Sequence, residues 1–179
     1  WSDYNPQKAL DYLSQSVRDT AFVGKMHGPS NSDNYLKFLV EELKPVIDSN
    51  FSTLPDQRNT FVMGSSMGGL ISMYAICEYP EIFGGAGCLS THWIGNEDNF
   101  FEEVPAAYNS YLLSNLPDPA NHKIYFDFGT KTLDQYYEPW QQKVDESMKT
   151  KGYNNSNWMT KKFPGDAHME EDWANRLDI

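Results

Sequence analysis

The sequence predicts an α/β fold with a mostly parallel sheet, because short apolar segments typical of buried strands alternate with segments that have helical spacing. The strand-like segments are 59–63, 83–89, 123–128 and 158–163. With 179 residues, 40% of them hydrophobic, the chain is long enough for one sizeable core. No repeat, low-complexity tract or linker divides it, so residues 1–179 are expected to form a single domain.

One helix is predicted before the first strand. Residues 1–31 mix aromatic, polar, glycine and proline residues without periodicity, and we expect irregular surface chain there. Apolar residues recur at helical spacing between positions 33 and 50, which predicts a helix. Ser32 or Asp33 is placed to cap this helix, and Pro45 is expected to bend it.

The first strand leads into the run Gly64-Ser65-Ser66-Met67-Gly68-Gly69, which fits the pattern G-x-S-x-G. In this pattern a sharp turn between a strand and a helix exposes a serine nucleophile, here Ser66. Residues 70–77 are apolar nearly all round and end before Tyr79-Pro80, as expected of a buried helix. A purely structural turn could have the same composition. The strand before it and the helix after it favour the interpretation that Ser66 is a nucleophile.

Two glycines flank Ser66 at crowded positions of this turn. Side chains two residues before or after the serine would clash with the neighbouring strand or helix, so Gly64 and Gly68 are expected to provide space. Ser65 competes for the role of nucleophile. Its side chain, at an x position of the pattern, should point away from the apex of the turn.

The second half of the chain supplies the remaining elements. The glycine-rich strand at 83–89 is followed by the loop Ser90-Thr91-His92-Trp93. A long aromatic and acidic stretch then reaches Ala120, and no element is assigned to it. Helices are expected after the third and fourth strands, at 134–151 and 170–177.

Composition and charge narrow the range of functions. The formal net charge of -11 disfavours nucleic acid and anionic membranes as partners. No apolar run has the length of a membrane span and no signal-peptide pattern opens the chain, so we expect a soluble protein of undetermined compartment. Cys77 and Cys88 are expected to be free buried thiols. No spacing of His, Cys or carboxylates indicates a metal site, and no cofactor is expected.

Several segments together carry a resemblance to a known family. They are Ser32-Asp33-Asn34-Tyr35, Phe38 to Leu43 with Ile47, Gly64 to Gly69, Phe128-Gly129-Thr130, and Gly165-Asp166-Ala167-His168 with Trp173 and Arg176. Their order resembles the α/β-hydrolase fold, and more narrowly the esterase family that includes esterase D, siderophore esterases, feruloyl and acetyl xylan esterases and the mycolyltransferases. The resemblance covers nearly the whole chain. It implies a three-layer sandwich, with about four strands of its sheet in this chain.

That family places several strands before the strand that leads into the nucleophile turn, and this chain has no room for them. At roughly 30 residues per βα unit, three or four such strands amount to about 100 residues. The opening residues Trp1 to Lys8 resemble the segment that directly follows those strands. The resemblance therefore implies that residues 1–179 are the C-terminal portion of a longer domain, completed by an N-terminal segment or by a partner chain.

A serine nucleophile needs a histidine to accept its proton and a carboxylate to orient that histidine. In the α/β-hydrolase fold the chain order is serine, acid, histidine, with each group on a loop at the carboxyl end of a strand. Only His168 follows all the credible acids, and it is the predicted base. We expect Trp173 and Arg176 to hold the histidine loop rather than to touch substrate. Two of the other histidines are expected to be surface residues: His27 and His122.

The acid comes from four candidate carboxylates: Asp127, Asp134, Glu138 and Asp166. Asp127 lies inside the third strand, whereas Asp134 lies beyond that strand, where the fold places its acid, so we predict Asp134. A different role is open for this residue. Thr132 and Gln135 fit a capping box, in which Asp134 would merely favour the N-terminus of a helix.

The oxyanion hole needs two backbone N–H groups, and Met67, the residue after the nucleophile, is expected to supply one. The resemblance places the second donor on a loop after an early strand that this chain does not contain. Ser65, His92 and Trp93 are expected to line the substrate pocket. For Trp93, the sequence is equally consistent with a side chain that packs into the core.

The sequence thus predicts a serine esterase that works through an acyl-enzyme. Ser66 would attack the acyl carbonyl, His168 would act as base and then as acid, and Asp134 would orient it. A small-molecule or carbohydrate ester is the expected substrate. Two alternatives stay open: an acyltransferase of the same family, and a non-catalytic or incomplete hydrolase-like domain that needs the missing N-terminal segment.

Overall fold

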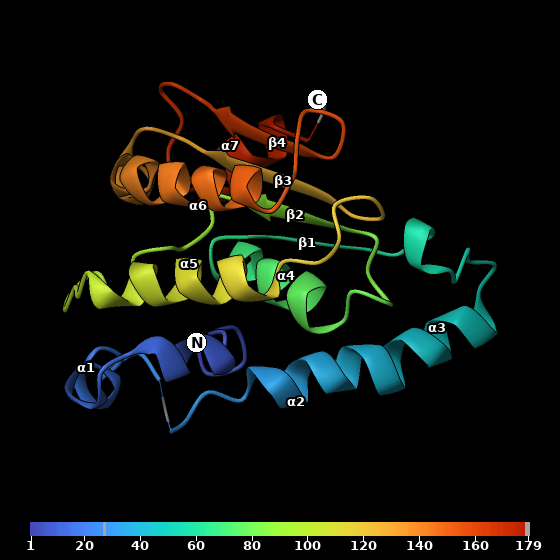
Figure 1. The fold of residues 1–179 in the computed structure, drawn as a ribbon, viewed down its shortest axis with the longest axis horizontal. Coiled ribbons are helices and arrows are strands. Elements are labelled where there is room, and N and C mark those ends of the chain that lie inside the picture. Colours follow the sequence, from blue (N-terminus) through green and yellow to red (C-terminus); the bar gives the residue numbers. More distant parts are fainter. Residues whose placement is uncertain (27, 178–179) are drawn as a thin grey trace.

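The computed structural model describes residues 1–26 and 28–177 and is built around one sheet of four strands (Figure 1). The strand order β1-β2-β3-β4 follows the chain, and all three pairings are parallel. The predicted α/β class with a parallel sheet is therefore confirmed. The strands are β1 (Phe61–Ser65), β2 (Gly85–Leu89), β3 (Lys123–Phe128) and β4 (Trp158–Lys162).

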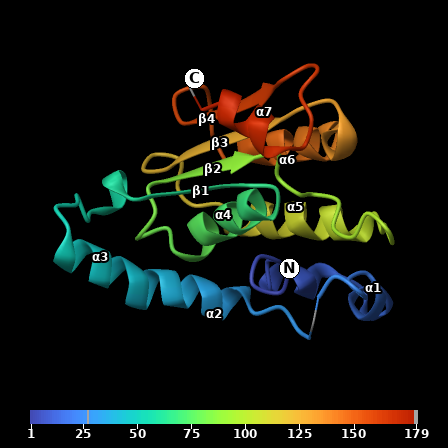
Figure 2. The ribbon, with the colours of Figure 1, turned by 180° about the vertical axis from the view of Figure 1, so that it is seen from behind.

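The strand order determines where the connecting helices lie. Adjacent parallel strands joined in chain order by right-handed crossovers put every connecting helix on the same face of the sheet. Figures 1 and 2 show this arrangement for α4 (Met67–Glu78), α5 (Glu103–Asn115) and α6 (Glu138–Thr150). The sheet side chains that face these helices are buried: Ala86, Cys88, Ile124, Phe126 and Phe128.

The opposite face of the sheet is covered over only part of its area. Near the carboxyl ends of the strands it carries α7 (Glu170–Asn175), which lies in front of the sheet in Figure 2. Toward the edge strand β1 it is open, because Phe61 and Met63 are each 61% exposed. Among the described residues no helix has the length and apolar character needed to cross a bilayer.

The N-terminal segment, predicted to be irregular, contains the 3₁₀-helix η1 (Lys8–Tyr12) and the helix α1 (Gln15–Thr20). Helix η1 packs against α5, and five apolar residues of this segment join the core: Ala9, Leu13, Val17, Ala21 and Phe22. Helices this short are not stable by themselves, and they have too few turns to show a periodicity in the sequence. Packing against α5 stabilises η1, and burial of Val17 in the core stabilises α1.

The helix predicted at 33–50 is confirmed, but Asn31, rather than Ser32 or Asp33, stands at its N-cap position. Ser32 Oγ instead accepts the backbone N–H of Gln7, and Asp33 accepts the hydroxyl of a tyrosine in α4. A wider π-helical stretch ends two residues before Pro45, whose ring would crowd a regular turn. The three parts are α2 (Ser32–Lys37), η2 (Phe38–Leu43) and α3 (Lys44–Asn50).

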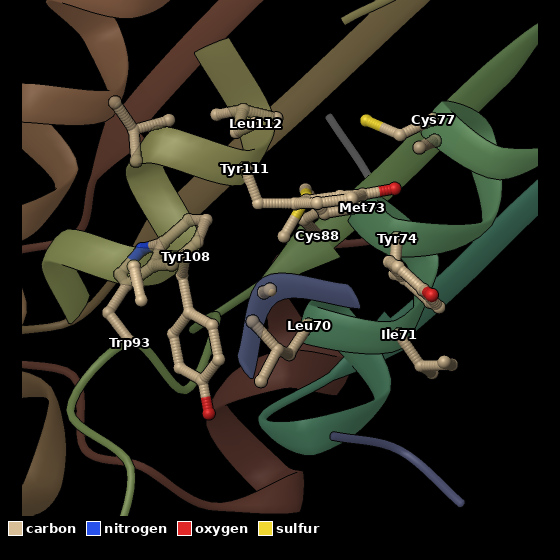
Figure 3. Packing of buried hydrophobic residues seen from close by; sticks show 14 of the residues in the cluster. Leu70, Ile71, Met73, Tyr74, Cys77, Cys88, Trp93, Tyr108, Tyr111 and Leu112 are labelled. Carbon is tan, nitrogen blue, oxygen red and sulfur yellow. The ribbon is translucent and has the colours of Figure 1, made fainter. Parts of the chain in front are cut away.

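Helix α5 occupies the aromatic, acidic stretch to which the sequence assigns no element. Pro105 lies in its first turn, where a missing N–H costs no helical hydrogen bond. Figure 3 shows α5 packed against α4. The ring centroids of Tyr74 in α4 and Tyr111 in α5 lie 5.2 Å apart. Cys77 and Cys88 lie in the same core as free buried thiols, as predicted.

The remaining elements match the prediction in type and order but, apart from β3, differ from it in their bounds. The helix expected at 134–151 is divided into η4 (Thr132–Tyr136) and α6, and the last helix ends at Asn175. A short 3₁₀-helix, η3 (Gln57–Asn59), precedes β1, and the strand begins and ends two residues later than predicted, at Phe61 and Ser65.

Gly64 lies where two backbones meet. A Cβ at Gly64 would lie 2.6–2.8 Å from backbone atoms of Gly68, whereas a Cβ at Gly68 would meet nothing within 4 Å. The steric role predicted for both glycines is therefore right for Gly64 and wrong for Gly68. The two positions differ because a side chain at Gly68 would point into the open cavity beside Ser66 and not toward the backbone.

We expect Gly64→Ala to lower the free energy of unfolding by about 1–3 kcal/mol, because β1 and the first turn of α4 must move apart. Gly68→Ala is the matched control. It should leave the free energy of unfolding unchanged or raise it, because alanine is the better helix former and has space here. Urea unfolding measures both changes, and equal losses in the two variants would contradict the steric argument.

Candidate active site

Ser66 occupies the sharp turn between β1 and α4 with φ 57° and ψ -120°, a conformation that non-glycine residues rarely adopt. Hydrogen bonds to the neighbouring strand hold it there. Its N–H donates to the carbonyl of Leu89 at 2.9 Å, and its own carbonyl accepts the N–H of His92 at 3.2 Å. The turn thereby holds the Ser66 side chain at the carboxyl end of the sheet.

Three residues that are far apart in the sequence form one chain of hydrogen bonds at this edge. Ser66 Oγ lies 2.8 Å from Nε2 of His168, and Nδ1 of the same ring lies 2.6 Å from Oδ1 of Asp134. They are the serine, histidine and acid that the sequence predicts as a triad. A carboxylate accepts the Nδ1 proton, so the lone pair of Nε2 faces the serine hydroxyl.

Asp134 lies in η4 and is fully buried. Burial by itself would raise the pKa of its carboxyl. Hydrogen bonds from His168, from the Ser90 hydroxyl at 2.6 Å and from the Gly129 N–H at 2.5 Å outweigh it and hold that pKa below its usual value. The carboxylate is therefore ionised at neutral pH and is hydrogen-bonded through both oxygens.

His168 is held in place from several sides. Its backbone N–H donates to Oγ1 of Thr132 at 2.7 Å. The indole ring of Trp173 stands edge-on to the imidazole with centroids 4.9 Å apart, and the ring of Tyr137 does so at 5.7 Å. These contacts leave the imidazole little freedom to turn away from the serine.

The other three carboxylates considered as the acid do not contact His168. Asp127 is buried in β3 and pairs with Arg176 at 3.0 Å. Asp166 accepts a hydrogen bond from Nε of the same arginine at 3.0 Å, and Glu138 pairs with Lys162 at the surface. Their partners indicate structural roles.

Arg176 and Trp173 hold the loop that carries His168, as the sequence analysis expects. Arg176 reaches Asp166 in that loop, and Trp173 donates its indole N–H to Ser90 at 2.9 Å. Gly129 provides the necessary space, because a Cβ there would lie 2.4 Å from the carbonyl oxygen of Asp166. Trp173 also faces the cavity described next, which the sequence analysis did not expect.

A cavity of about 640 Å³ opens beside Ser66 and His168. Ser65, predicted to line a substrate pocket, lines this cavity, and so does Met67, whose backbone N–H is the first in α4. The first N–H groups of a helix have no partner inside the helix, so they are available to an anion. The other lining residues are mostly aromatic or apolar and include Tyr4, Tyr35, Leu36, Leu39, Met63, Ile71, Glu170 and Trp173.

His92 and Trp93 do not line this cavity, which corrects the prediction that they would. They are only 3% and 1% exposed, because the loop turns them inward under α6. His92 Nδ1 lies 2.9 Å from the hydroxyl of Tyr137, and the indole N–H of Trp93 donates to Gln141 at 3.0 Å. Burial lowers the pKa of His92 to about 4, so this ring is neutral at physiological pH.

Two further histidines were expected at the surface. His122 is buried, with its ring nitrogens near the carbonyls of Asp118 and Pro80, so that expectation is wrong. His27 lies outside the described residues. Among the described residues no group of three or more His, Cys, Asp or Glu side chains is arranged to hold a metal ion.

Sequence reasoning did not identify two features of this site. The first is the tyrosine pair Tyr4 and Tyr35, whose rings stack edge-on 5.1 Å apart at the cavity. Burial, together with Tyr4, raises the pKa of Tyr35 to about 12. The second is Ser90, whose hydroxyl donates a hydrogen bond to Asp134. Its position directly after β2, at the same edge of the sheet, is a signal that could have identified it.

A sequence model of the family "Esterase: Putative esterase" matches residues 7–178. The uncharacterized protein YbbA of Bacillus subtilis (strain 168) is 27% identical to this chain over 158 residues, which are 84% of this chain and 55% of YbbA.

Solved structures resemble the chain in fold at low sequence identity. An IroE-like serine hydrolase from Shewanella oneidensis has a TM-score of 0.68 at 15% identity, over 99% of this chain and 54% of that protein. A ferulic acid esterase from Anaeromyces mucronatus has a TM-score of 0.63 at 17% identity, over 84% of this chain and 54% of that protein. The chain thus spans about half the length of YbbA and of these two solved structures.

Proposed function

Because the chain belongs to the Esterase family and has an α/β-hydrolase-like fold, we propose that it is a serine hydrolase that cleaves carboxylic esters. The observation that carries this proposal is the hydrogen-bond chain from Ser66 through His168 to Asp134. Its members are 102 and 34 residues apart in the sequence, and they meet at one edge of the sheet. Each has the partner that its proposed role requires.

The proposed reaction has two halves. In the first, Ser66 Oγ attacks the acyl carbonyl while Nε2 of His168 takes the hydroxyl proton. The tetrahedral intermediate then collapses, the ester C–O bond breaks, and the leaving alkoxide takes that proton. In the second half water attacks the acyl-enzyme, gives a proton to Nε2, and the serine recovers it as the carboxylic acid leaves. Asp134 stays ionised throughout and stabilises the imidazolium.

The developing negative charge on the acyl oxygen needs hydrogen-bond donors. We propose the backbone N–H of Met67 as one of them, because it begins α4 directly after the serine. The positive end of the helix dipole lies at the same point and favours the oxyanion. A loss of one oxyanion donor typically costs about 10²- to 10³-fold in kcat, so this N–H is an important part of the proposal.

The cavity favours a neutral ester. Its described lining residues include no lysine or arginine that could pair with an anionic substrate. The side chains of Tyr4, Tyr35 and Trp173 offer aromatic surface for an apolar or ring-containing group. We therefore propose a neutral small-molecule or carbohydrate ester as the substrate class.

Labelling with a serine-directed fluorophosphonate tests the proposed function. The full-length protein should form a stoichiometric adduct, and mass spectrometry of its peptides should locate that adduct at Ser66. The Ser66 hydroxyl is expected to be reactive because His168 can accept its proton. Absence of an adduct at Ser66, in protein that is folded by circular dichroism, would favour a non-catalytic hydrolase-like domain instead.

We also propose that residues 1–179 are the C-terminal portion of a longer domain, which adds further strands beside β1. Strand β1 lies at the edge of the sheet, with exposed Phe61 and Met63 on its open face. Native proteins rarely leave such an apolar edge uncovered. In the full-length protein the backbone amides of β1 should therefore exchange hydrogen as slowly as those of β2. Fast exchange at β1 alone would contradict the proposal.

A further inference from the structure

Ser90 is the first residue after β2 and is fully buried behind the candidate active site. Its φ of 41° lies in the left-handed region, which a serine adopts at some energetic cost. Its backbone N–H donates to Oδ1 of Asp127 at 3.0 Å and lies 3.0 Å from the carbonyl oxygen of the same residue. A strained backbone that is held so firmly indicates that the side chain has a specific task.

The Ser90 hydroxyl has three partners, and their chemistry determines which way its proton points. The indole N–H of Trp173 and Nη1 of Arg176 can only donate, and they lie 2.9 and 3.0 Å from Oγ. A hydroxyl has two acceptor sites and one proton. With both acceptor sites taken, the proton of Ser90 can go only to its third partner, Oδ2 of Asp134, at 2.6 Å.

The Ser90 hydroxyl therefore donates to the oxygen of the Asp134 carboxylate that is not hydrogen-bonded to His168. Oδ2 accepts hydrogen bonds from Ser90 and from the Gly129 N–H, while Oδ1 accepts Nδ1 of His168. Two donors on one oxygen restrict rotation of the carboxylate. The cation of Arg176 behind Ser90 polarises the hydroxyl and strengthens its bond to the carboxylate.

We propose that Ser90 is a positioning residue for Asp134, which it orients so that His168 keeps its proton on Nδ1 and its lone pair toward Ser66. The inference rests on the proposed function of the triad and adds a fourth member that touches neither substrate nor serine. A purely structural role is the alternative. In that case the hydroxyl would serve only to satisfy Arg176 and Trp173, and its loss would lower stability without a selective effect on turnover.

The experiment compares Ser90→Ala with Thr91→Val in the full-length protein. Thr91 is the next residue, is equally buried, and gives its hydroxyl to the carbonyl of Cys88 at 3.3 Å without touching Asp134. Each variant removes one buried hydroxyl, so their thermal midpoints report the structural cost. Ser90→Gly is the second test variant, because glycine adopts a φ of 41° without strain.

Hydrolysis of p-nitrophenyl acetate and proton NMR provide the two readouts. We expect Ser90→Ala and Ser90→Gly to lower kcat about 10- to 100-fold, the usual worth of a hydrogen bond to a charged group, with KM within about twofold. Thr91→Val should keep both constants within about twofold. The low-field resonance of the His168 Nδ1 proton should move or broaden only in the Ser90 variants.

Each outcome decides one of the two proposals. If folded Ser90 variants keep kcat and the His168 resonance of the unaltered protein, or if Thr91→Val loses as much turnover, the positioning role is overturned. If the unaltered protein has no activity that depends on Ser66, the proposed function fails. The NMR comparison still decides the positioning role in that case, because the Asp134 to His168 hydrogen bond does not require turnover.

Discussion

Ser66→Ala is expected to lower kcat for ester hydrolysis on the order of 10⁶-fold, the size seen when the nucleophile of a hydrogen-bonded triad is removed. The expectation follows from the geometry around Oγ. Among the described residues, His168 Nε2 is the base within 2.8 Å of it, and the cavity for an acyl group opens beside both. Among the described residues that line this cavity, no other hydroxyl is hydrogen-bonded to that imidazole.

Ser65→Ala is the matched control, because Ser65 is the neighbouring serine and also lines the cavity. It should change kcat by less than about tenfold, since its hydroxyl is not hydrogen-bonded to His168 in the structure. Steady-state kinetics with a soluble short-chain ester measure both variants, and circular dichroism verifies that each is folded. Retained activity in Ser66→Ala together with lost activity in Ser65→Ala would show that the nucleophile is assigned wrongly.

Asp134→Asn should lower kcat by about 10⁴-fold, because it reverses the tautomer of His168. The two donors on Oδ2, Ser90 and the Gly129 N–H, will hold the amide oxygen on their side. The amide NH₂ then faces Nδ1 of His168, which must become an acceptor. Nε2 consequently carries the proton and can no longer take one from the serine.

The matched control for this variant is Glu138→Gln, which changes a carboxylate to an amide a few residues away. Glu138 pairs with Lys162 at the surface, and exposed pairs of this kind contribute little. Its kcat should stay within about twofold of that of the unaltered protein. The acid would have to be reassigned if Glu138→Gln, or the buried Asp127→Asn in folded form, cost more turnover than Asp134→Asn.

Much of the fold could be predicted from the sequence, because strands buried on at least one face need apolar residues and crossover helices need helical spacing. Strand β3 has the predicted bounds, and the other strands lie within two residues of them. Helices η1, α1 and α5 could not be predicted in this way. Their apolar residues are few or mixed with polar ones, so no clear periodicity marks them, and η1 and α5 are stabilised by packing against each other.

The candidate site was predictable where chemistry and chain order restrict the choice. G-x-S-x-G, a later acid and a final histidine point to Ser66, Asp134 and His168, and the structure brings these three within hydrogen-bonding distance. Their catalytic roles stay predictions until the variants are measured. The pocket was less predictable, because a loop residue at the correct edge can turn inward, as His92 does, and sequence position does not reveal its direction.

The sequence by itself determined the α/β class, the turn at Ser66 and the order of the candidate triad, because these depend on local patterns and on residue type. Only the tertiary structure decided which groups surround the triad. Ser90 meets Trp173 and Arg176 across 83 and 86 residues of chain, and Tyr4 meets Tyr35 at the cavity. Such contacts arise when segments distant in the sequence pack together, so no local pattern records them, although they orient the acid and shape the pocket.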